Sequence, residues 1–100
     1  MASISSIGSS GMQAAQMRLD ASAHNVANAN TPNYRRTAVE QEAAPDNGGT
    51  RARMERQSNE KVALEKEAVE QISATYSFAA NLLSVKTEGR LMGTLLDERA

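Results

Sequence analysis

Cysteine and tryptophan are both absent from the sequence, and its only aromatic residues are two tyrosines and one phenylalanine. The lack of cysteine excludes disulfides and thiolate chemistry. The lack of bulky rings affects folding, because 100 residues with 40% hydrophobic content offer little volume for an independent core. We therefore expect a single domain over residues 1–100 that needs partner molecules to bury its apolar surface.

An excess of charge of either sign is also missing. The net charge is -1, from 11 basic and 12 acidic side chains, so no overall field attracts nucleic acid or an anionic membrane. The middle third does contain a basic cluster, but acidic residues are interleaved with it, which favours a solvated mixed-charge segment over a nucleic-acid site. The basic residues are Arg35, Arg36, Arg51, Arg53 and Arg56, and the acidic ones are Glu40, Glu42, Asp46 and Glu55.

Long apolar runs are absent too. No stretch reaches the length of about 18 apolar residues that a membrane-spanning helix requires, so no membrane span is expected. At the N-terminus, five serines between Ser3 and Ser10 interrupt the apolar core that a secretory signal needs. Any export is therefore expected to proceed without a cleavable signal peptide.

What the sequence does contain is helical periodicity at both ends. In residues 1–30 we expect a helix over residues 4–29 with two adjacent seams, each advancing in alternating steps of three and four residues. A single wide apolar face is the alternative. The first seam is Gly8, Met12, Ala15, Leu19, Ser22, Val26 and Ala29; the second, mostly of small residues that allow close approach, is Ile4, Ile7, Gly11, Ala14, Arg18, Ala21, Asn25 and Asn28.

A second, longer helix is predicted in residues 59–100, running over 59–97 with Ser58 or Asn59 as its cap. Its charged first part, Glu60 to Glu70, should face water, whereas the uncharged part from Gln71 to Val85 should be enclosed. One stripe is Leu64, Ala68, Thr75, Phe78, Leu82, Val85, Met92 and Leu96, and the adjoining one is Val62, Val69, Ile72, Tyr76, Ala79 and Leu83.

The connecting segment, residues 31–58, has a different composition. Alternation over residues 37–41, a possible return strand over 50–55 and the turn signal Pro45-Asp46-Asn47-Gly48-Gly49 are consistent with a short β-hairpin. An irregular loop is equally consistent, because the strands are poor in β-branched residues and two strands alone are marginal in water.

Together these patterns predict an all-α fold in which two long antiparallel helices form a coiled-coil hairpin, joined by a loop or a short β-hairpin, and which oligomerises. We expect Leu19 and Val26 on the first helix to face Ile72, Phe78 or Leu82 on the second. The full set of predicted helix-packing residues is Met12, Ala15, Leu19, Val26, Ile72, Tyr76, Phe78, Ala79, Leu82, Val85 and Leu96.

Residues suited to catalysis are scarce. His24 has Asp20 four residues before it, but a lone helical histidine is more often a surface or interface residue than a catalyst, and Ser22 and Ser84 lack a plausible activating set. One histidine, no cysteine and dispersed carboxylates do not form a metal site. We therefore predict no enzymatic activity, no metal and no cofactor.

Amides cluster where the first helix must end. Asn25, Asn28, Asn30 and Asn33 fall within nine residues, and Pro32 disfavours helical geometry at Thr31. Asn30 or Asn33 can adopt the left-handed conformation that closes a helix, and the amide side chains can bond exposed carbonyls and fix the exit direction of the chain. Solvent-exposed amides without such a role are the alternative.

These residues carry a family resemblance. Gly11 to Asp20, followed by Asn25 to Arg35, closely resembles the N-terminal signature of bacterial flagellar basal-body rod, hook and hook-associated proteins; the motif residues are Asn25, Ala27, Asn28, Asn30, Thr31, Pro32, Asn33 and Tyr34. Residues 73–96 resemble the C-terminal motif of the same family. Asn33 stands where the family usually has glycine, and asparagine is the next-best residue for a left-handed turn.

The resemblance implies a structural role. The short middle segment is similar to that of a small rod-type subunit, because hook and distal-rod members carry large β-domains there. The family implies export by the flagellar type III apparatus, terminal helices paired as a coiled coil, and assembly with copies of itself and related axial proteins in the basal body. An alternative is a helical-hairpin adaptor or export-chaperone-like binding module that carries the same motif.

Overall fold

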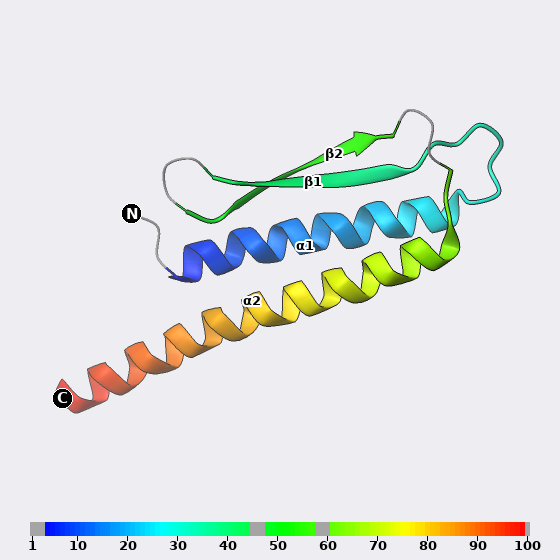
Figure 1. The fold of residues 1–100 in the computed structure, drawn as a ribbon. Helices are drawn as coiled ribbons and strands as arrows, with labels where there is room; N and C mark the ends of the chain where they lie inside the picture. Colours follow the sequence, from blue (N-terminus) through cyan, green and yellow to red (C-terminus); the bar gives the residue numbers. More distant parts are fainter. Residues whose placement is uncertain (1–3, 45–47, 58–60, 100) are drawn as a thin grey trace.

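The structure, a computed structural model, describes residues 4–44, 48–57 and 61–99. Its elements are α1 (Ile4–Ala27), β1 (Thr37–Ala43), β2 (Thr50–Arg56) and α2 (Leu64–Arg99). Figure 1 shows three layers, with α1 lying between α2 on one side and the β-hairpin on the other. The molecule is elongated, with principal extents of 63 × 26 × 14 Å. The predicted pair of long antiparallel helices is confirmed, and the connection between them is the hairpin rather than an irregular loop.

α1 ends at Ala27, two residues before its predicted end, and passes into a series of tight turns. The backbone N–H of Thr31 donates to the carbonyl of Asn28 at 3.0 Å, and that of Tyr34 donates to Thr31 at 3.2 Å. Asn33 has a φ of 62°, which confirms the left-handed conformation expected from its place in the motif. This turn reverses the chain so that β1 runs back along α1.

The hairpin pairs β1 with β2 in an antiparallel register that extends from Thr37 opposite Arg56 to Ala43 opposite Thr50. Pro45, Asp46 and Asn47 of the predicted turn lie outside the described residues, while Gly48 and Gly49 have φ values of 70° and 87°. At Gly49 a Cβ atom would lie 2.8 Å from the Ser10 hydroxyl oxygen. That hydroxyl accepts from the Thr50 backbone N–H at 2.9 Å and so attaches this end of the hairpin to α1.

α2 begins at Leu64, five residues later than predicted. The expected cap residues, Ser58 and Asn59, lie outside the described residues, and the first helical hydrogen bond runs from the Glu67 N–H to the Ala63 carbonyl at 3.0 Å. Before the helix, the Gln57 N–H still donates to the Arg36 carbonyl at 2.8 Å and continues the hairpin ladder.

The two helices approach closely where α1 carries glycines. A Cβ on Gly8 would lie 2.7 Å from a Val85 methyl group, and one on Gly11 would lie 2.5 Å from the Asn81 side chain. At Gly8 the Asn81 backbone carbonyl is also within 3.2 Å of that position, so glycine permits the helix spacing there. At Gly11 the close atoms belong to the end of the Asn81 side chain, which would have to move to admit a Cβ atom. The expectation that small residues of α1 admit another helix is confirmed at Gly11.

Both predicted seams of α1 contribute buried residues, because α2 covers one side of α1 and the hairpin covers the other. Its buried residues come from both seams: Gly8, Ala14, Ala15, Ala21, Ser22 and Asn25. Within residues 4–44, 48–57 and 61–99, the buried hydrophobic side chains are all alanines, namely Ala14, Ala15, Ala21 and Ala74. The interior of the single chain therefore contains no large apolar side chain from the described segments, and most of its hydrophobic bulk lies outside.

Candidate functional site

Asn25 is the central residue of a polar junction that joins α1, the hairpin and α2. Its side-chain NH₂ donates to the Thr37 carbonyl at 2.8 Å, and its oxygen accepts from the Thr37 N–H, also at 2.8 Å. The Tyr34 hydroxyl lies 3.2 Å from the same oxygen, and the NH₂ group also reaches Glu67 at 3.2 Å. Asn25 is fully buried. Its amide thus takes the place of a neighbouring strand for Thr37, the first residue of β1.

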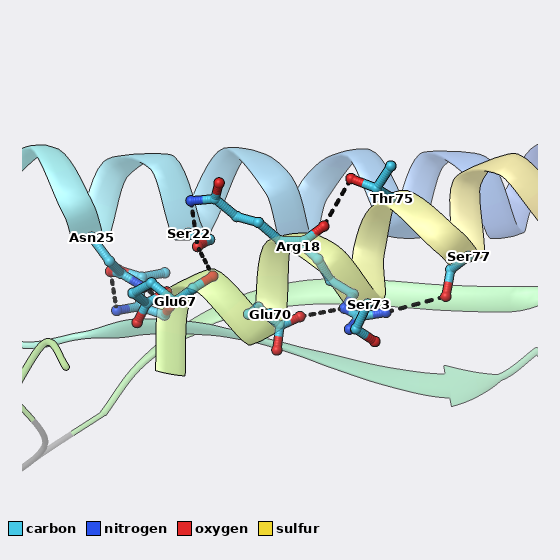
Figure 2. A network of polar contacts seen from close by, with 10 residues as sticks. Arg18, Ser22, Asn25, Glu67, Glu70, Ser73, Thr75 and Ser77 are labelled. Atoms are coloured by element: carbon cyan, nitrogen blue, oxygen red, sulfur yellow. Dashed lines mark hydrogen bonds and ion pairs between the residues drawn. The ribbon is translucent and has the colours of Figure 1, made fainter. Parts of the chain in front are cut away.

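Glu67 completes the junction from the side of α2 (Figure 2). Its carboxylate accepts from the Arg36 guanidinium at 2.6 Å, and its backbone carbonyl accepts from the Ser22 hydroxyl at 3.2 Å. Gln71 adds a donor to the Ser22 oxygen at 3.1 Å. Glu67 is fully buried and Arg36 is 6% exposed. No buried side-chain nitrogen or oxygen within the described segments is left without a hydrogen-bond partner, which is the condition for a tolerable buried ion pair.

Sequence reasoning missed both members of this ion pair. Glu67 lies in the charged part of α2 that was expected to face water, and that expectation is wrong at this position. Arg36 was grouped with solvated arginines of the middle segment and is instead buried. A usable signal was the spacing of Glu67 seven residues before Ala74, which places both on one helical row.

The other motif residues shape the turn. The Asn28 side chain donates to the His24 carbonyl at 3.0 Å, near the end of α1, and the Thr31 hydroxyl donates to the Asn28 side-chain oxygen at 3.2 Å. These bonds match the expected pairing of amides with helix-end carbonyls. Asn30 and Pro32 are exposed, as is Ala27.

His24 takes part in an aromatic contact rather than in a catalytic set. Its ring meets the Tyr34 ring edge-on at a centroid distance of 6.4 Å, and the Arg56 guanidinium lies 5.4 Å from the centre of the Tyr34 ring. Asp20 instead accepts from Gln16 at 3.0 Å. No group of three or more potential metal ligands occurs in the described parts of the chain.

A second polar group joins the middle of α1 to the first half of α2. The Arg18 guanidinium donates to Glu70 at 2.5 Å and to the Ser73 hydroxyl at 2.9 Å, with a longer contact of 3.5 Å to Ser77 (Figure 2). Nearer the open end, the Ser5 hydroxyl donates to Glu88 at 2.7 Å. The face of α2 that meets α1 therefore combines polar and small residues with apolar ones, since a Val85 methyl group approaches Gly8 and Phe78 and Leu82 are half-buried.

The predicted helix-packing residues divide into two groups. Ala15 is buried and five others are half-buried: Met12, Leu19, Phe78, Leu82 and Val85. The remaining five are exposed in the single chain: Val26, Ile72, Tyr76, Ala79 and Leu96.

The expected opposition of Val26 to Ile72, Phe78 or Leu82 is wrong, because the neighbouring Asn25 meets α2 at Glu67, near its start. The outward-facing side chains of residues 71–85 are exposed in the single chain, so their enclosure stays a prediction that concerns the assembled protein.

Five exposed hydrophobic residues of α2 form one row, which we call the outer seam: Val69, Ile72, Tyr76, Ala79 and Leu83. Their steps of three and four residues place them on one helix face. The four large side chains are between 61 and 76% exposed. Ala74, which is fully buried, lies between members of this row in sequence but on a different face. The outer seam thus points away from the interface with α1.

Neither helix, over the residues that the structure describes, has the apolar length needed to cross a membrane. An exposed apolar patch of the kind that the outer seam forms commonly marks an interaction site.

Residues 6–35 match the family model described as flagella basal body rod protein. The matched segment covers most of α1 and the motif turn through Arg35, including Asn25, and stops one residue before Arg36. This finding confirms the resemblance drawn from the N-terminal motif and supports a rod-type structural role. A search of curated proteins finds no match.

Proposed function

We propose that this protein is a structural subunit of the bacterial flagellar basal-body rod and that it assembles by side-by-side packing of its terminal helices. The observation that carries the proposal is the outer seam of α2, with Ile72 and Tyr76 at 61 and 76% exposure on a helix whose inward row contains Glu67 and Ala74. The match of residues 6–35 to the basal-body rod family model supports the rod as the structure to which such a subunit contributes.

The outer seam has the properties of a helix-packing surface. Its spacing is that of a coiled-coil seam, and residues 71–85 contain no charged side chain. Burial of large apolar side chains stabilises an interface by roughly 1.5–3 kcal/mol for each one fully buried. Because the described interior holds only alanines among its buried hydrophobic residues, contacts with neighbouring helices would supply apolar burial that the single chain lacks.

The partners in this proposal are copies of the chain and related axial flagellar proteins, and the protein would reach them through the flagellar export apparatus. The polar junction would give each subunit a fixed shape before it packs, since Asn25 and Glu67 hold the helices and the hairpin in one register. The protein then acts through packing geometry, with no catalytic step.

The alternative is a helical-hairpin adaptor or export-chaperone-like module, which would also use an exposed apolar face. The two functions differ in location and in assembly. A rod subunit should be retained in purified basal bodies, whereas an adaptor should remain outside them and form a small closed complex.

The test is to express a tagged chain in flagellated cells and to assay purified basal bodies for the tag. Ala79→Asp provides the control, because it places a charge on the outer seam without altering a buried residue. The proposal predicts that the unmodified tagged chain is retained and that the Ala79→Asp chain is lost. Absence of the unmodified chain from basal bodies, with normal expression, would contradict it.

A further inference from the structure

The hairpin has two outer edges, and its ladder shows which backbone groups face outward. The Gln57 N–H donates to the Arg36 carbonyl, and the Ala44 N–H donates to the Gly49 carbonyl, so both are hydrogen-bonded pairs of the ladder. The pairs that alternate with them in an antiparallel ladder direct their backbone groups outward. Along β2 the outward groups therefore belong to Thr50, Ala52, Met54 and Arg56.

At one end of each strand the outward groups already have partners within the chain. Asn25 binds both the N–H and the carbonyl of Thr37 on β1, and Ser10 accepts from the Thr50 N–H on β2. Within residues 4–44, 48–57 and 61–99, the outward N–H and carbonyl groups of Ala52 and Met54 have no hydrogen-bond partner. Free backbone groups at a sheet edge are a template for a further strand.

A groove lies between this free edge of β2 and α1, and we call it the β2 groove. It has a volume of about 450 Å³, and its lining includes Asp20, Ala21 and His24 of α1 with Met54 and Arg56 of β2. Met54 is 50% exposed there. Asp20 already accepts a hydrogen bond from Gln16 at 3.0 Å. An extended segment that paired with Ala52 and Met54 would run along this groove and reach α1.

The groove beside β1 is smaller and is partly enclosed by α2. Its volume is about 160 Å³, and α2 contributes Lys66, Glu67 and Glu70 to its lining. Asn25 already takes the strand-pairing position at Thr37 on that side. The described lining of the β2 groove, in contrast, contains no residue of α2. The edge of β2 is therefore the one that an extended segment can approach.

The side chains of β2 indicate the charge of such a segment. Three exposed arginines, Arg51, Arg53 and Arg56, outnumber the single glutamate, Glu55. Of the three, Arg53 alone forms an ion pair with a described residue, which is Glu40 of β1 at 3.0 Å. The Arg56 guanidinium lies over the Tyr34 ring. The free edge of β2 is therefore complementary to acidic side chains.

β1 shows which sequence pattern pairs with β2. In the register of the hairpin, Val39 lies opposite Met54, Glu40 opposite Arg53 and Glu42 opposite Arg51. An apolar residue thus meets the methionine and a carboxylate meets each of two arginines. A strand on the other edge of β2 would meet the same three side chains, so the same pattern suits it.

We propose that the β2 groove binds an extended acidic segment of a partner protein, which adds to β2 as a third strand. A second copy of β1 is not suited to this position, because β1 packs on α1 of its own chain and its Thr37 is held there by Asn25. Its inward side chains therefore cannot enter the groove of another molecule. This binding requires only one chain, so it goes beyond the proposed packing of helices and is tested without assembly.

A peptide with the sequence of residues 37–43 is the probe, because it carries both glutamates of the matching pattern. The peptide is labelled with fluorescein and titrated into the Ile72→Glu chain, whose substitution lies on the outer seam and limits sideways assembly. Fluorescence anisotropy measures binding. A peptide with lysine in place of Glu40 and Glu42 is the charge control and should bind several-fold more weakly. Equal binding of both peptides, or no binding of either, would overturn the proposal.

Amide hydrogen exchange locates the bound peptide. Addition at the free edge should slow exchange of the Ala52 and Met54 N–H groups. Displacement of β1 by the peptide would leave these two groups facing outward, so binding without slower exchange at Ala52 and Met54 would refute the proposal. Slower exchange there that increases with chain concentration in the absence of peptide would assign the edge to a second copy instead, which would also overturn it.

Proline at matched positions of the two edges provides the sharpest control. Ala52 and Gln41 lie opposite each other, and the N–H of each faces outward, so proline at either position removes no bond of the ladder. Ala52→Pro removes a donor from the free edge of β2 and should weaken binding of the acidic peptide about tenfold. Gln41→Pro should leave its affinity unchanged. Equal weakening by both variants, or weakening by neither, would contradict addition at β2.

Discussion

The two faces of α2 differ in a way that a free-standing helical hairpin would not show, because the exposed face is rich in large apolar side chains. The face toward α1 contains Glu67, Ala74 and Asn81, whereas the face away from it contains Ile72 and Tyr76. A soluble hairpin normally buries its apolar stripe between the helices. Here hydrogen bonds, close glycine contacts and half-buried apolar side chains such as Phe78 and Val85 hold the helices together. The buried ion pair joins α2 to Arg36, just before β1, and a second apolar stripe of α2 remains outside.

The difference suggests that the two faces of α2 have different roles. The inward face defines the shape of the subunit, because directional contacts such as those of Arg18 and Glu67 select one register. The outward face is suited to assembly, because apolar packing between copies needs surface that is not already used within the chain. Substitutions on the two faces should therefore affect different measurements.

The largest effect is expected at the buried ion pair. Replacing Glu67 with alanine leaves the Arg36 guanidinium buried without its counter-charge, which costs about 3–5 kcal/mol of unfolding free energy. Circular dichroism during denaturant titration should show a large loss of stability. Glu67→Gln, which retains an acceptor for Asn25, is the matched control and should be milder. Equal, small effects of both variants would show that the inward polar face does not hold the helices together.

A carboxylate placed at Ala74 should be almost as damaging. Ala74 is fully buried, and an unpaired charge at that position costs about 3 kcal/mol. Hydrogen exchange should reveal loss of protection along both helices. Protection equal to that of the unmodified chain would mean that the interface opens at little cost.

The same substitution on the opposite face, Ala79→Asp, should give the reverse pattern. Ala79 is exposed, so the unfolding free energy of a single chain should change by less than about 1 kcal/mol, mainly from lower helix propensity. Assembly measured by pelleting should be abolished, because a charge would be buried in the outer seam. Normal pelleting of the Ala79→Asp chain would remove the distinction between the two faces.

The smallest effect is expected on the hairpin, away from both faces of α2. A hydrogen bond from Arg53, with a further one from Glu55, holds the pKa of Glu40 below its usual value, whereas the hydrogen bond with Glu40 raises the pKa of Glu55. Glu55, whose pKa is raised, favours the folded hairpin at acid pH. This contribution is lost as the pH rises through the pKa of Glu55 in the folded chain. Glu40, whose pKa is lowered, acts in the opposite direction. Its contribution to stability is present above the pKa of Glu40 in the unfolded chain and is lost as the pH falls through its pKa in the folded chain.

Glu55→Gln isolates the first of these contributions, because it removes the titrating carboxyl and leaves the pair of Glu40 and Arg53 intact. The weakening of hairpin amide protection on raising the pH through the Glu55 titration should be smaller in this variant. All these groups are fully exposed, so the change should be slight. Identical pH profiles for the two chains would show that Glu55 does not contribute.

The sequence was informative about local structure. Periodicity predicted both helices, glycines and asparagine predicted the turns, and the left-handed conformation of Asn33 followed from its place in the motif. These features depend on neighbouring residues, which the sequence displays directly. The motif also carries the resemblance to flagellar rod proteins, and the family-model match over residues 6–35 confirms that resemblance.

The sequence did not show which face of α2 packs on α1. Periodicity identifies an apolar stripe but does not say whether its partner is the other helix of the chain or a helix of another molecule. The inward face was determined by contacts between distant residues, such as Asn25 with Thr37 and Glu67. Glu67 looked solvated because its neighbours in sequence are charged, yet helix rotation places it next to Arg36.

Sedimentation velocity of the purified chain over a range of concentrations tests most directly whether the outward face of α2 serves assembly. The unmodified chain and Glu42→Ala should form species heavier than the 10.7 kDa single chain, increasingly so at higher concentration. Ile72→Glu should remain at 10.7 kDa with its helical content unchanged. An unmodified chain that stays at the mass of a single helical molecule at every concentration, alone and when mixed with rod proteins, would contradict the account.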